Sequence, residues 1–95
     1  MPNASRMNDM TTGHGPFAPV PIIKGSTNVM INGQGAARQT DQTLIHCAGP
    51  ACHATPVKSG SSTVNINGFQ AARVGDPITC GGTIITGSAT VFIGG

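Results

Sequence analysis

The chain has 95 residues, a formal net charge of +2 and few aromatic residues, with no Trp, no Tyr and three Phe. It has no Lys/Arg cluster that would form the electrostatic footprint of a nucleic-acid-binding protein, and no apolar run approaches the ~18 residues of a membrane span. The 14 Gly and 7 Pro, with only 8% charged residues, indicate strands and turns, and residues 1–10 lack the pattern of a secretory signal.

A repeated motif organises the chain. The stretch GSTNVMINGQGAARQTD at 25–41 returns as GSSTVNINGFQAARVGD at 60–76, and GSATVFIGG at 87–95 begins a third copy. The part that this third copy lacks is found near the start, where SRMND at 5–9 aligns with ARQTD at 37–41 and ARVGD at 72–76. Such self-similarity indicates a repeat architecture. We therefore predict a single domain of three units, at about 6–37, 38–72 and 73–95, with the third unit shared between the two ends.

Each unit predicts a β-hairpin. Apolar residues alternate at 29–31, 64–66 and 91–93, which is the period of a strand with one buried face. The apolar runs at 19–25, 55–60 and 82–87 supply a partner strand across each Gly-Ser pair. Asn-Gly at 32–33 and 67–68 predicts a tight turn after the second strand, and a short helical turn is expected only at 41–49. The predicted fold is all-β, a small conical, pseudo-threefold arrangement of hairpins with little or no helix.

Every Arg and every acidic residue belongs to an Arg-x-x-Asp motif, which occurs three times. One such pair on a surface would be a solvated ion pair worth ~0–1 kcal/mol. Three pairs in register, with no acid left over, indicate repeated structural elements instead. The pairs are Arg6/Asp9, Arg38/Asp41 and Arg73/Asp76.

A candidate metal ligand follows each motif: His14, then His46, then Cys80. His53 is a fourth candidate, and it aligns with Cys80 when the Gly-Ser pairs are superposed. Nitrogen and sulfur donors suit a tetrahedral Zn²⁺, and four protein ligands make a structural site. We predict that these four residues hold a structural zinc ion that staples the narrow end of a domain with a marginal core.

Cys47 and Cys52 leave alternatives open. The segment HCAGPACH at 46–53 could bind metal through these two thiols. The two could also form a disulfide in an oxidising compartment. Scattered surface histidines without any metal are a further alternative. The repeat favours the first ligand set, because Cys47 and Cys52 have no equivalents in the other units.

The repeated ING-x-x-AAR, preceded by GS-x-x-V and followed by x-x-D, resembles the PAAR-repeat family over almost the whole chain. Gly35 and Gln70 stand where the family's eponymous Pro would be. The resemblance implies a sharp conical β-domain at the tip of a trimeric spike, which in type VI secretion systems is the valine-glycine repeat protein, VgrG. It also implies a zinc ion near the vertex held by three His and one Cys, which correspond by position to His14, His46, His53 and Cys80.

The predicted function is therefore that of a structural tip protein that caps a trimeric VgrG-like spike, one copy per trimer. It would help the spike pierce a target envelope and could recruit effector proteins. A pseudo-threefold chain can match a threefold partner on its axis, and open strand edges on its broad face could extend the partner's sheets. We expect it in the bacterial cytoplasm before firing, and then in or beyond the target envelope without a signal peptide. The repeat fills the chain, so no fused toxin domain is expected.

Other function classes fit the sequence less well. An enzyme is not expected, because all three acids lie in the repeated motif, Glu is absent, and little sequence remains for a substrate pocket. A tip for a phage or bacteriocin baseplate spike would work by the same mechanics. A stand-alone zinc-binding β-domain is the other alternative, and it would form no complex with a trimeric spike.

Overall fold

The computed structural model describes residues 1–13 and 17–95. Its strands are short and pair antiparallel, β1 with β2, β3 with β4, and β5 with β6. No helix occurs in these residues, which confirms the all-β class, and none of them forms a helix able to cross a membrane. The helical turn expected at 41–49 is wrong, because a strand takes up part of that segment. The strands are β1 (Met30–Ile31), β2 (Gln34–Gly35), β3 (His46–Ala48), β4 (Ala51–His53), β5 (Asn65–Ile66) and β6 (Phe69–Gln70).

Two of the hairpins close across Asn-Gly, as the tight-turn signal predicted. In β5–β6, Ile66 pairs with Phe69 around the turn at 67–68. The φ values of Asn67 and Gly68 are 54° and 84°. Two successive positive φ values are the mark of a type I′ turn, whose twist matches that of the flanking strands. The hairpin β1–β2 repeats this arrangement around 32–33.

The Gly-Ser pairs have a different role from the one expected. The sequence predicted a hairpin turn at each pair. In the structure the Oγ of Ser61 instead accepts hydrogen bonds from the N–H groups of Thr63 and Val64, at 3.2 and 2.9 Å, and so forms a local hydroxyl turn. The same turn recurs at Ser26 and Ser88. Local turns of this kind compete with strand pairing for backbone donors. The expected pairing across Gly-Ser is therefore wrong.

The apolar runs pair with the next unit instead of with their own. Ile22 bridges to Thr43, Val57 bridges to Ile78, and Ile84 returns to Thr11. An inner set of bridges joins the start of each unit to its later part, with Arg6 to Ala36, Arg38 to Ala71, and Arg73 to Ala4 near the start of the chain. Through the outer bridges each unit contacts its successor around a common axis, and the third contacts the first.

A closed ring of backbone hydrogen bonds marks this axis. The N–H of Ser5 donates to the carbonyl of Ala72, Ala72 donates to Ala37, and Ala37 donates back to Ser5, each at 3.0 Å. All three residues are fully buried. Only small side chains allow three backbones to approach this closely, which explains why the repeat carries Ala-Ala before Arg. The ring gives the chain a pseudo-threefold centre.

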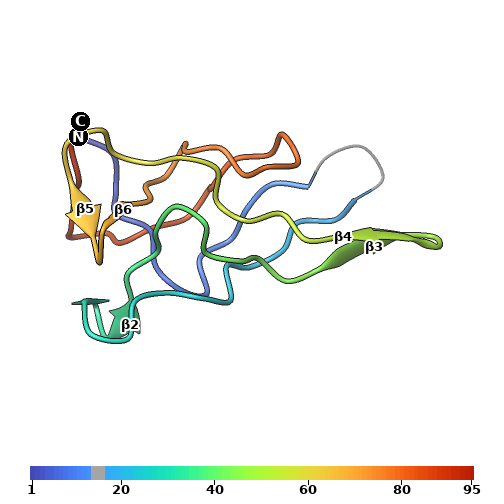
Figure 1. Cartoon of the computed structure of the whole chain (residues 1–95), viewed down its shortest axis with the longest axis horizontal. Helices are drawn as coiled ribbons and strands as arrows, with labels where there is room; N and C mark the ends of the chain where they lie inside the picture. Colours follow the sequence, from blue (N-terminus) through green and yellow to red (C-terminus); the bar gives the residue numbers. More distant parts are fainter. Residues whose placement is uncertain (14–16) are drawn as a thin grey trace.

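The core consists of layers along the axis. One apolar cluster contains Ala4, Ile31, Ala36, Ile66, Ala71 and Ile93. The other contains Ile22, Ala37, Val57, Ala72, Ile78 and Ile84. The molecule measures 37 × 23 × 23 Å along its principal axes, so it is elongated with two equal short axes. Both chain ends and the Asn-Gly hairpins lie at one end, and β3–β4 extends toward the other (Figure 1).

Each Arg-x-x-Asp motif ties the start of its unit to a later part of the same unit. The carboxylate of Asp41 accepts hydrogen bonds from the N–H, Nε and Nη2 of Arg38 at 2.8, 3.0 and 2.9 Å. The Nη1 of Arg38 then reaches the Oδ1 of Asn67 in the next hairpin at 3.0 Å. The hydrogen bond to Asp41 raises the pKa of Arg38, and partial burial opposes this. Arg6 and Arg73 make the same bonds to their own Asp, and reach Asn32 and the carbonyl of Gly94.

The Asn-Gly turns should not accept a β-branched residue. We expect Gly68→Val to lower the free energy of unfolding by about 2 kcal/mol, because a β-branched side chain is strained at a φ of 84°. Chemical denaturation measures the loss. Gly68→Asn is the matched control and should cost clearly less, since Asn tolerates this conformation. Equal stability of Gly68→Val and the parent protein would show that the turn is not where we place it.

Ser5 breaks the chemical symmetry of the axial ring. Its equivalents are Ala37 and Ala72, and within the described residues the buried Oγ of Ser5 has no hydrogen-bond partner. We expect Ser5→Ala to stabilise the fold by about 1 kcal/mol, because a buried hydroxyl without a partner costs about 1–3 kcal/mol. A rise in melting temperature measures the gain, and Ser61→Ala, which removes a bonded hydroxyl, should lower it. A destabilised Ser5→Ala variant would mean that the hydroxyl has a partner.

Candidate metal centre

Loops at the narrow end carry the predicted ligands. Each loop starts after the Asp of an Arg-x-x-Asp motif and closes on the backbone of that Asp. The closing bonds are Ile22 N–H to Asp9 O at 2.9 Å, Val57 N–H to Asp41 O at 2.9 Å, and Ile84 N–H to Asp76 O at 3.0 Å. These closures lie at the buried layer, so each loop projects from a fixed base.

The second loop is built around β3–β4. Gly49 has a φ of 61° and Pro50 follows it, which fits a type II′ turn with Gly at its first central position. This turn places His46 opposite His53 and Cys47 opposite Cys52. Cys47 and Cys52 form a disulfide. Of the alternatives left open by the sequence, the structure therefore has the disulfide.

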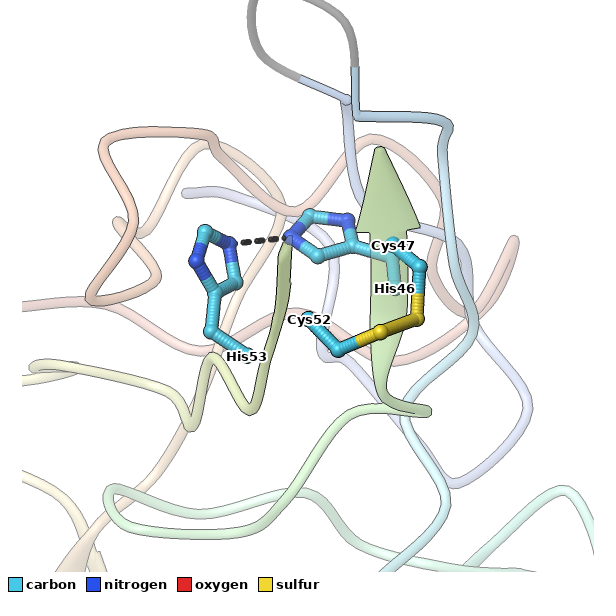
Figure 2. Close-up of a disulfide and its surroundings, with 4 residues drawn as sticks. All are labelled: His46, Cys47, Cys52 and His53. Carbon is cyan, nitrogen blue, oxygen red and sulfur yellow. Dashed lines mark hydrogen bonds between the residues drawn. A yellow bond between two sulfur atoms is a disulfide. The ribbon is translucent and has the colours of Figure 1, made fainter. Parts of the chain in front are cut away.

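The two histidines of this hairpin face each other. His46 is buried, and its Nδ1 lies 3.0 Å from the carbonyl oxygen of Ala18. Because a carbonyl oxygen can only accept, Nδ1 carries the hydrogen, and the lone pair of the neutral ring is at Nε2. That Nε2 lies 2.7 Å from the Nε2 of His53 (Figure 2). A hydrogen bond that the ring nitrogen remote from the metal donates to a carbonyl oxygen is a usual way in which proteins orient a metal-binding imidazole.

Cys80 adds a sulfur donor from the third loop. It is a free, half-buried cysteine that packs against the apolar cluster around Ile22 and Ile84. The ligand atoms of His46, His53 and Cys80 all lie within 4.8 Å of one another. Donors bound to one zinc ion lie about 3–4 Å apart, given Zn–N and Zn–S bonds of about 2.0 and 2.3 Å. The three side chains could therefore hold a metal ion, with their donor atoms drawn somewhat closer together for zinc.

The model of the PAAR motif family matches residues 9–86, which include every loop at the narrow end. The chain belongs to the PAAR motif family. PAAR proteins are structural, metal-binding components of spike tips and are not a family of enzymes. Comparison with curated proteins gave no match.

The PAAR resemblance placed four ligands at the vertex, and the described residues bring three of them together. His46 and His53 come from the second loop and Cys80 from the third. His14, the candidate from the first loop, lies outside the described residues. No ligand-sized cavity opens among residues 1–13 and 17–95.

An aromatic contact of this PAAR domain was missed by the sequence analysis. Phe17 stacks on His53 with ring centroids 4.3 Å apart and an interplanar angle of 24°, and it lies 4.9 Å from His46. It therefore covers the histidine pair on one side and shields it from water. The available signal was weak: Phe17 is one of three Phe, three residues after His14. The carbonyl of Ala18 was equally unpredictable, because a backbone acceptor has no sequence signature.

Proposed function

We propose that this PAAR protein caps a trimeric VgrG-like spike of a type VI secretion system, with one copy per trimer. The observation that carries the proposal is the ring of backbone hydrogen bonds through Ser5, Ala37 and Ala72. A single chain with a threefold centre can sit on the axis of a true trimer and offer a similar surface to each subunit. A domain without internal symmetry would leave two subunits of the trimer mismatched.

The broad end is the surface that would face the spike. Met30 and Phe92 occupy equivalent positions in two units and are 56% and 47% exposed, and Phe69 in β6 is 42% exposed. The hairpins that carry Met30 and Phe69 lie at the end that holds both chain termini (Figure 1), and Phe92 bridges to Asn3 near the N-terminus. Large exposed apolar side chains of this kind are candidate contacts for a protein partner. In the proposed complex the spike buries these side chains.

We further propose that the narrow end holds a structural zinc ion. His46, His53 and Cys80 would be its ligands, with His14 as the fourth. The support is the nitrogen and sulfur donor set and the tautomer imposed on His46 by Ala18. A zinc ion there supplies folding free energy, because it ties together loops from different units. The tip would then resist deformation as it is driven into an envelope.

The protein would be delivered together with its spike. It would assemble on its spike in the bacterial cytoplasm and reach the target envelope only as the spike fires. Effector proteins bound to the sides of the cone would travel with it.

The test is complex formation with a purified trimeric VgrG-like spike, followed by multi-angle light scattering. We expect a mass of one tip per spike trimer. Met30→Ser combined with Phe92→Ser should weaken binding at least about tenfold, because exposed aromatic and long apolar anchors dominate interfaces. Ile45→Ser is the matched control. Ile45 is 59% exposed but lies next to β3, away from the proposed interface, so this variant should bind the spike as tightly as the parent protein. No complex, or three tips per trimer, would contradict the proposal. The same measurement with a spike from a contractile phage tail tests the alternative partner.

A further inference from the structure

The disulfide and the histidine pair occupy adjacent rungs of one short hairpin. Cys47 pairs with Cys52, and the next pair inward is His46 with His53. Successive residues of a strand point to opposite faces, so the disulfide is on the face away from the imidazoles. Figure 2 shows the two imidazoles directed toward each other, with the disulfide joining the strands beside them. The cross-link is therefore not a ligand, but it holds the two strands that carry two ligands.

The disulfide is the main support of the part of this hairpin that lies nearest its turn. Each strand has three residues, and both cysteines are exposed. Within the described part of the chain, none of the groups from Cys47 to Cys52 hydrogen-bonds outside the hairpin. A two-stranded hairpin of this length is marginal in water without added support. The register also matters, because a slip by one residue would turn a histidine to the other face.

His53 depends on the hairpin more than His46 does. His46 is buried, and its Nδ1 is bonded to Ala18 in the first loop, so its ring is fixed from outside the hairpin. His53 is the last residue of β4 and is half-buried, with Phe17 stacked on it. The pairing of β3 with β4, which the disulfide fixes, sets it opposite His46.

We propose that the Cys47–Cys52 disulfide is a positioning element of the metal centre and makes its zinc affinity redox-dependent. The inference rests on the zinc site proposed above. With the disulfide formed, His46 and His53 are held ready for the ion. With it reduced, binding must also order the hairpin, so the affinity falls. The centre is thus tighter in an oxidising compartment than in a reducing one.

Reduction of this disulfide is a balanced two-electron step. A water-soluble phosphine attacks one sulfur and breaks the S–S bond, and water then converts the phosphonium to the phosphine oxide. The two sulfurs gain two electrons and two protons, and Cys47 and Cys52 become thiols. Both cysteines are exposed, so the reagent can reach them. Cys80 is already a free cysteine and is not changed by this step.

The test measures the zinc dissociation constant by competition with a chromophoric chelator. The parent protein is measured without phosphine, with its disulfide formed, and after reduction with phosphine. The Cys47→Ser/Cys52→Ser variant is measured under the same two conditions. We expect the reduced protein and the variant to bind one zinc ion about tenfold to a hundredfold more weakly than the oxidised protein. The variant should not respond to phosphine. Circular dichroism of each zinc-free form is used to choose a measuring temperature at which the oxidised protein, the reduced protein and the variant are all folded.

The other outcomes separate this inference from the zinc site itself. Equal affinity in all forms would overturn the redox coupling and leave the zinc centre standing. Absence of zinc binding to the oxidised protein would overturn both. Tighter binding after reduction, absent from the serine variant, would show the thiols of Cys47 and Cys52 acting as ligands, and it would also overturn the inference.

Discussion

Replacing Cys80 by Ala should remove bound zinc and lower the melting temperature by about 20 °C together. The sulfur of Cys80 is the donor from the third loop, and His46 and His53 supply donors from the second. Structural zinc sites contribute several kcal/mol or more to folding, and in a domain of this size each kcal/mol corresponds to about 4–8 °C. Elemental analysis and differential scanning calorimetry measure the two quantities.

The neighbouring residue supplies a matched control for this prediction. Thr79 is exposed in the same loop, so Thr79→Ala should keep both the zinc and the melting temperature. A chelator should lower the melting temperature of the parent protein and of Thr79→Ala, and leave Cys80→Ala unchanged. His14→Ala should behave like Cys80→Ala if His14 is the fourth ligand. Full zinc content in Cys80→Ala would refute the ligand assignment.

Gly60→Ala should destabilise the fold by about 3 kcal/mol or more. A methyl group at Gly60 would overlap the carbonyl oxygen of Ala71, which also accepts the N–H of Ser61 at 2.8 Å. Overpacking usually costs about 1–3 kcal/mol, and here the atom in the way belongs to the backbone of a fully buried residue, which cannot turn aside. Urea denaturation followed by circular dichroism gives the loss.

The repeat supplies replicates and a control for the Gly60 prediction. At Gly25 and Gly87 the added carbon would lie 2.7 Å from the carbonyl oxygens of Gly35 and Ala4, so alanine there should also destabilise. At Gly94 its nearest neighbours are atoms of Met1 at 3.5 Å and beyond, which is ordinary contact. Gly94→Ala should therefore cost less than about 1 kcal/mol. A tolerated Gly60→Ala would mean that the backbones do not approach as closely as described.

Much of the fold could be predicted because the repeat carries its own chemistry. Asn-Gly predicted the turns at 32–33 and 67–68, since both residues accept a positive φ. The Arg-x-x-Asp pairs were recognisable because no other acids or arginines exist in the chain. The strand partners were not predictable. Alternating apolar residues fit a hairpin across Gly-Ser as well as a bridge from Ile22 to Thr43, and only the packing around the axis decides between them.

The candidate site was predictable to a similar degree. His46 and Cys80 stood out because each follows an Arg-x-x-Asp motif, and His53 because it aligns with Cys80. The disulfide could not be decided from the sequence, because it depends on the two-residue turn at 49–50, which sets Cys47 opposite Cys52. A turn of three residues would have offset the two thiols. Phe17 contacts the histidines across loops, which no local pattern encodes.

The pairing between residues near the two termini has a consequence for biosynthesis. Ala4 donates its N–H to Val91, and Ile93 donates to Pro2, so the segment around residues 2–4 is completed by one made more than 80 residues later. On the ribosome, the nascent chain therefore lacks a full set of partners until residues 91–93 have emerged. Such high contact order slows folding and favours a single late, cooperative step. Ribosome-stalled chains that lack this segment should remain sensitive to protease.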